Sequence, residues 1–98
     1  MVCKGLPSRK GKTSWIHDVD EKPAPYTVVD EIVWLQSNFP DKALCVHKLV
    51  FKSDPHNEFR FGYYMCRKGR WWWGQYAPML PPDDVKYMVA EMHKRGWV

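Results

Sequence analysis

Two short segments with alternating side chains constrain the fold of this chain more than any other feature. Residues 58–66 read EFRFGYYMC, so a large apolar side chain stands at every second position. Residues 70–77 read RWWWGQYA, and only residues 67–69 separate the two segments. Alternation with period two is typical of a half-buried strand, and two strands with a short connection form an antiparallel hairpin. We therefore expect an antiparallel hairpin over residues 58–77.

A third strand and a C-terminal helix are expected around this hairpin. Residues 44–52 are short and rich in β-branched side chains, which favours a strand. Pro81 and Pro82 precede a segment that begins with two aspartates, a pattern typical of a helix N-terminus. This segment has an apolar stripe at helical spacing, which predicts that the helix packs on one face of the sheet. The stripe consists of Val85, Met88, Val89 and Met92.

Residues 28–39 are ambiguous between helix and strand. Their apolar residues recur at spacings of four, three and four, which describe one face of a helix, although β-branched residues favour a strand. The periodicity predicts a helix at 28–39. The expected fold class is thus α+β: an antiparallel β-meander of three or four strands, this helix before it, and the C-terminal amphipathic helix on one face.

The positive charge of the chain is concentrated at its N-terminus. Residues 1–12 contain Lys4, Arg9, Lys10 and Lys12 and no acidic residue, and the whole chain of 98 residues also has a net charge of +4. Such a segment has too little apolar surface to order itself. We therefore expect residues 1–12 to form a basic flexible tail and residues 13–98 to form a single α+β domain. The tail is either a basic arm for phosphates or simply a solvated terminus.

The register of the hairpin determines which side chains share a face. If residues 67–69 form a three-residue loop, Cys66 pairs with Arg70 and the two glycines of the hairpin face each other. One face then carries Phe59, Phe61, Tyr63, Met65, Trp71, Trp73 and Gln75, and we expect it to lie under the C-terminal helix. The other face and its turn present a candidate nucleic-acid-binding set, which consists of Arg60, Tyr64, Arg67, Arg70, Trp72 and Tyr76. A slip of one residue would reverse this assignment.

Aromatic rings that stack on bases, together with arginines that hold phosphates, are what a single-strand-binding surface needs. The chain has no Gly-rich phosphate loop, no GxSxG or HExxH motif and no paired cysteines of a zinc site, so we expect no enzyme activity, no cofactor and no metal. No apolar run approaches the length of a membrane span, and the first residues lack the apolar core of a signal peptide, so we expect a cytoplasmic protein with no membrane segment.

The sequence thus predicts a small non-enzymatic nucleic-acid-binding or regulatory protein, whose partner is single-stranded DNA or RNA. The alternative is a protein-interaction or homo-oligomeric module, such as a homodimer, whose aromatic sheet face is the interface. With six tryptophans in 98 residues, some rings remain outside any core that so short a chain can form.

Overall fold

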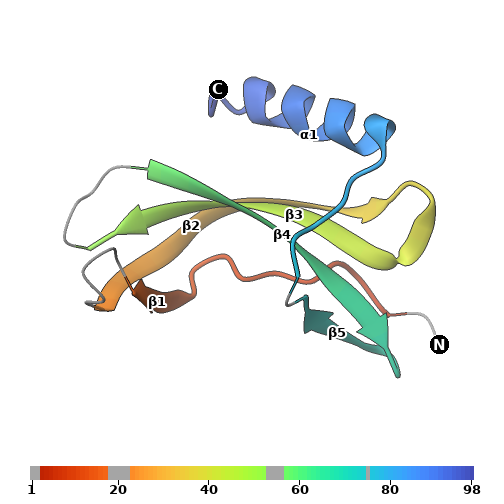
Figure 1. Cartoon of the computed structure of the whole chain (residues 1–98), viewed down its shortest axis with the longest axis horizontal. Coiled ribbons are helices and arrows are strands. Elements are labelled where there is room, and N and C mark those ends of the chain that lie inside the picture. Colours follow the sequence, from red (N-terminus) through yellow and green to blue (C-terminus); the bar gives the residue numbers. More distant parts are fainter. Residues whose placement is uncertain (1–2, 18–22, 53–56, 75) are drawn as a thin grey trace.

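The computed structural model of the protein describes residues 3–17, 23–52, 57–74 and 76–98. Five antiparallel strands form one sheet whose order follows the chain, and one helix lies against it (Figure 1). The predicted α+β class, the antiparallel meander and the C-terminal helix are therefore confirmed. The elements are β1 (Thr13–His17), β2 (Pro23–Gln36), β3 (Phe39–Phe51), β4 (Asn57–Arg67), β5 (Arg70–Trp73) and α1 (Pro82–Lys94).

The predicted helix at residues 28–39 is wrong, because most of this segment belongs to β2 and the rest lies in the β2–β3 turn and the start of β3. The pairing between β2 and β3 shifts by one residue between Val28 and Asp30. This bulge leaves Val28 in a different apolar cluster from Ile32. A bulge of this kind breaks the period of two, so the apolar spacing resembled that of a helix. The β-branched composition was the better indicator.

The core on the helix side of the sheet is built by β2, β3 and α1. Ile32, Leu44 and Val46 are almost fully buried there, and Met92 of α1 packs onto them. Of the predicted apolar stripe, Met88 and Met92 face the sheet, whereas Val85 and Val89 are 40% and 50% exposed.

A buried aspartate fixes the N-terminal end of α1 to β2. Asp84 is 2% exposed and accepts a hydrogen bond of 2.9 Å from the indole Nε1 of Trp34. The hydroxyl of Ser37 donates to the second carboxylate oxygen at 2.7 Å. These donors hold the pKa of the Asp84 carboxyl below its usual value, although burial acts in the opposite direction. Asp84 is therefore a structural anchor as well as a favourable charge at the start of the helix.

The hairpin between β4 and β5 has a two-residue turn instead of the predicted three-residue loop. Arg67 pairs with Arg70, and both Lys68 (φ 53°) and Gly69 (φ 73°) have left-handed backbone conformations. Two successive positive φ values are the signature of a type I′ turn, whose twist suits an antiparallel hairpin. The register of β5 is consequently one residue away from the prediction, and each of its side chains lies on the opposite face.

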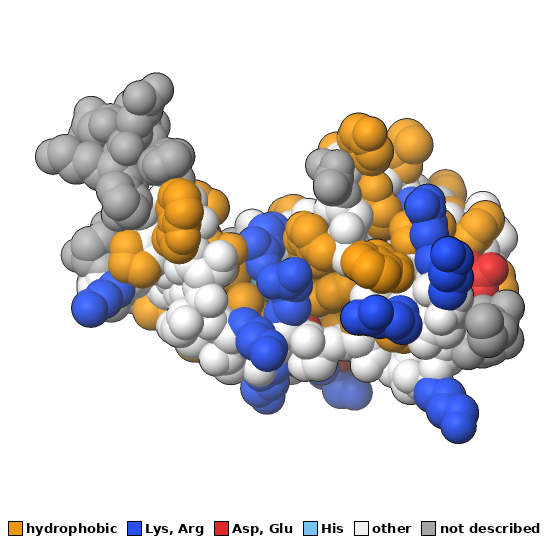
Figure 2. Space-filling view, turned by 90° about the horizontal axis from the view of Figure 1, so that it is seen from below, with side chains coloured by type: hydrophobic (Ala, Val, Ile, Leu, Met, Phe, Trp, Pro, Cys, Tyr) orange, Lys and Arg blue, Asp and Glu red, His pale blue; other side chains and the backbone are white. Residues whose placement is uncertain are grey.

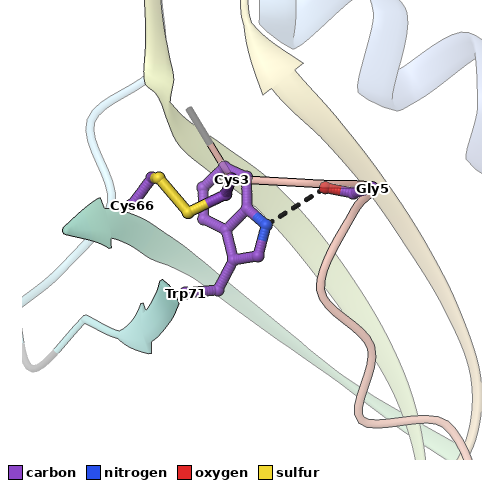
Figure 3. Close-up of a disulfide and its surroundings, with 4 residues drawn as sticks. All are labelled: Cys3, Gly5, Cys66 and Trp71. Atoms are coloured by element: carbon purple, nitrogen blue, oxygen red, sulfur yellow. Dashed lines mark hydrogen bonds between the residues drawn. A yellow bond between two sulfur atoms is a disulfide. The ribbon is translucent and has the colours of Figure 1, made fainter. Parts of the chain in front are cut away.

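Residues 3–12 run beneath the sheet, on the side away from α1 (Figure 1). The backbone N–H of Gly11 donates to the carbonyl of Val28 at 2.8 Å, so the pairing of β1 with β2 extends into this segment. At the other end, Cys3 forms a disulfide with Cys66 of β4, which the sequence did not indicate (Figure 3). The division into a flexible tail over residues 1–12 and a domain over residues 13–98 stays a prediction.

Candidate nucleic-acid interface

The structure does not bring the predicted binding residues together on one face. Arg60 and Tyr64 point away from α1, as expected, but the one-residue shift places Trp72 of β5 on the helix side of the sheet. Trp72 is 53% exposed, and the guanidinium of Arg70 lies 5.1 Å from its ring centroid. Tyr76 lies beyond the end of β5 and is 81% exposed.

Arg67 and Arg70 lie on either side of the hairpin turn, where both are exposed, so the tip of the hairpin is basic. The facing glycines expected between β4 and β5 are also absent from the observed pairing. Whether any residue of the predicted set binds nucleic acid stays a prediction.

Trp71 and Trp73, which were expected under the helix, lie on the face that carries Arg60 and Tyr64. The indole of Trp73 covers Gly62, where an added Cβ would be only 2.4 Å from the ring. The ring also stacks on His47 with a centroid distance of 5.4 Å and meets the edge of Tyr64 at 5.0 Å. Gly62 is thus required because an aromatic ring rests on its backbone.

A basic and aromatic hollow lies between the β4–β5 hairpin and residues 3–12, which we call the N-terminal segment. It has a volume of about 450 Å³, and its lining contains no acidic side chain. Figure 2 shows this side of the molecule, where Lys and Arg side chains lie among hydrophobic ones. The hollow is lined by Pro7, Ser8, Arg9, Lys12, Tyr64, Trp71 and Trp73.

A second hollow, of about 320 Å³, is lined by Cys3, Gly5, Leu6, Leu35, Pro40, Asp41 and Trp71. The half-buried indole of Trp71 lines both hollows and donates from Nε1 to the carbonyl of Gly5 at 3.1 Å (Figure 3). The N-terminal segment therefore lines both hollows. They lie on the face of the sheet that carries Tyr64, Trp71 and Trp73, which we call the aromatic face.

A buried polar network lies beneath Trp73. His47 is 0% exposed, and its Nδ1 accepts from Nη2 and Nε of Arg60 at 3.0 and 3.3 Å. Its Nε2 therefore carries the ring proton and lies 3.4 Å from Glu31 Oε2. The guanidinium of Arg60 also donates to the hydroxyl of Tyr26 at 2.5 Å. The guanidinium of Arg60 is thus held by internal partners.

Burial determines the protonation of this network. It lowers the pKa of His47 to about 4, helped by the neighbouring Arg60 and opposed by Glu31. Burial also raises the pKa of the Cys45 thiol to about 12, so this cysteine is protonated at neutral pH and is a poor nucleophile. In the described part of the chain, no group of three or more His, Cys, Asp or Glu side chains has a geometry that could hold a metal ion.

Glu31 connects this network to the N-terminal segment. The hydroxyl of Ser8 donates to Glu31 Oε1, and the backbone N–H of Arg9 donates to Oε2 at 3.1 Å. The guanidinium of Arg9 then lies 5.2 Å from the ring centroid of Trp73. The basic N-terminus is therefore part of the candidate site, although its sequence indicated only the charge.

Comparison with known proteins gives no relative from which a role could be transferred. No protein-family model, curated protein or solved structure matches the chain. Any functional assignment must therefore be based on the geometry of this site.

Proposed function

We propose that this protein binds single-stranded DNA or RNA, without enzyme activity, through the hollow between the N-terminal segment and the β4–β5 hairpin. The observation that supports this most strongly is the combination of Trp71, Trp73 and Tyr64 with Arg9 and Lys12 in one hollow. Aromatic rings accept bases of any sequence by stacking, while lysine and arginine neutralise the phosphates beside them. The volume of about 450 Å³ lies within the range of small-ligand sites and suits a single unpaired base with its phosphate.

The basic residues near the hollow extend this surface in two directions. Lys4 and Lys10 belong to the N-terminal segment, and Arg67, Lys68 and Arg70 form the exposed tip of the hairpin. A strand that places one base against Trp71 can therefore run from the tip towards the N-terminal segment. We place the protein in the cytoplasm, and no helix in the described ranges has the length and apolar character needed to cross a bilayer.

Titration of the purified protein into an end-labelled single-stranded oligonucleotide, followed by fluorescence anisotropy, tests this function. DNA and RNA versions of the same sequence show which of the two is preferred. We expect Trp71→Ala to weaken binding by about 1–3 kcal/mol, the contribution of one stacked base. The matched control is Trp72→Ala, which removes the same ring from the opposite face of the same strand and should bind like the wild type.

Salt dependence and molecular size separate this function from the alternative of a homodimer or protein-interaction module. Nucleic-acid binding should weaken steeply with salt: the logarithm of the binding constant should fall against the logarithm of the salt concentration with a slope of about −0.7 for each phosphate neutralised. The association constant of an apolar interface should change little with salt. If Trp71→Ala changes a dimer into a monomer on a sizing column and has no effect on oligonucleotide binding, the aromatic face is a subunit interface. Equal loss of binding in both tryptophan variants would contradict the proposed site.

A further inference from the structure

The N-terminal segment is held across the aromatic face by a covalent bond at one end. Cys3 and Cys66 have a Cα–Cα distance of 5.9 Å and are 63 residues apart in the sequence. Cys3 is buried, but residues 4–10 are all exposed or half-buried, and Leu6 is 51% exposed. A segment that buries so little apolar surface gains little from packing. The disulfide is therefore the main restraint on its outer end.

The inner end of the segment has the properties of a hinge. Gly11 has a φ of 86°, a left-handed conformation, and an added Cβ there would meet no atom within 4 Å. The backbone N–H of Gly11 is fixed to Val28 by a hydrogen bond, so residues from 12 onwards stay attached to β2. Rotation at Gly11 would move residues 3–10 away from the sheet and break the hydrogen bonds of Ser8 and Arg9 to Glu31, but it would not disturb β1.

In the closed position the segment limits access to the rings, so that the first hollow has room for a single base. The guanidinium of Arg9 lies 5.2 Å from the centroid of Trp73, while His47 stacks on the same ring. The indole N–H of Trp71 is bonded to the Gly5 carbonyl, which fixes the ring between the two hollows. Moving the segment away would merge the two hollows into one open groove along the aromatic face.

We propose that the Cys3–Cys66 disulfide is a redox latch that keeps residues 3–10 over this groove, and that its reduction by a dithiol increases the affinity for single-stranded nucleic acid. The inference rests on the proposed function and adds its regulation. Disulfides in the cytoplasm are usually transient or redox-sensing, which suits a latch at this position. Cys3 also lines the second hollow, so the bond lies beside solvent-accessible space.

The dithiol supplies both electrons for the reduction of the Cys3–Cys66 disulfide. One thiolate of the reductant attacks a sulfur of the Cys3–Cys66 bond, forms a mixed disulfide and releases the other cysteine as a thiolate. The second thiolate of the reductant then displaces the remaining cysteine. Two electrons pass from the dithiol to the protein, the reductant becomes a disulfide, and Cys3 and Cys66 become thiols.

The test compares the oxidised full-length protein with the protein reduced by dithiothreitol, using an end-labelled oligothymidine as the probe. We expect reduction to lower the Kd by about tenfold, the effect of one additional stacked base. The control is Cys3→Ser, which lacks the latch; it should bind like the reduced wild type and should not respond to dithiothreitol. Equal affinity of the oxidised and reduced wild type would overturn the latch while leaving the proposed function intact.

Acrylamide quenching of tryptophan fluorescence follows the opening without any nucleic acid. Reduction should increase quenching, because Trp71 and Trp73 become more accessible, and unchanged quenching would overturn the latch. If neither form binds the probe, the proposed function fails and the regulation with it, even where quenching shows that the segment moves. If reduction abolishes the circular-dichroism signal of the sheet, the disulfide is a structural brace and the latch is refuted.

Discussion

The buried His47 should make the stability of this protein depend on pH. Its ring is 0% exposed and accepts a hydrogen bond from the Arg60 guanidinium at Nδ1, so protonation would place a second cation against Arg60. The unfolded chain binds this proton near pH 6.5, whereas the folded protein binds it only near pH 4. Below pH 6.5 the unfolded state therefore holds more protons, and the free energy of unfolding falls as the pH decreases.

The magnitude follows from the interval between the two pKa values. About 2.5 pH units at about 1.4 kcal/mol per unit correspond to a loss of about 3–4 kcal/mol, complete once the pH is below about 4. Urea unfolding followed by tryptophan fluorescence, from about pH 7 to about pH 4.5, measures most of this loss. His47→Gln keeps a polar side chain but cannot titrate, so its stability should decrease much less over the same range. An identical pH dependence in both proteins would show that His47 is not the group responsible.

Three further predictions concern the core packing, a buried hydrogen bond and the register of the sheet. Met92→Ala should lower the free energy of unfolding by about 2–5 kcal/mol, because it removes a 5% exposed side chain from the core. Lys86→Ala, on the exposed side of α1, should change the free energy of unfolding by less than about 0.5 kcal/mol. Urea titrations measure both values. Asp84→Ala leaves a buried indole N–H without its acceptor and should cost about 1–3 kcal/mol in thermal unfolding, far more than Asp83→Ala at the exposed neighbouring position. Gly62→Ala should displace the indole that rests on it and reduce the near-ultraviolet circular dichroism of the tryptophans; an unchanged spectrum would contradict the observed register.

The elements with a clear period were predictable from the sequence. Strand β4 alternates over most of its length, and α1 has both its terminal signals and its apolar stripe, so each was found with its correct type. Strand β2 was misassigned because the bulge after Val28 changes the period in its middle. Sequence spacing alone cannot distinguish such a bulge from a helical repeat.

The candidate site depended on a smaller detail, the length of one turn. Lys68-Gly69 as a two-residue turn and residues 67–69 as a three-residue loop are both compatible with the sequence, but they present opposite faces of β5. The aromatic and basic character of the surface was therefore foreseeable, whereas the choice of Trp71 and Trp73 over Trp72 was not. The pairing of Cys3 with Cys66 was beyond prediction as well, since cysteine spacing does not determine connectivity.

The strand order of the sheet has a consequence for how the chain folds. Because every strand pairs with its neighbour in sequence, each hairpin closes only a short loop, and the sheet can grow one strand at a time. Contacts between residues far apart in the sequence, such as those of Asp84 with β2 and of Cys3 with Cys66, become possible only when this succession is complete. We therefore expect the sheet to form rapidly, helix docking to follow, and oxidation of the two thiols to be the slowest step.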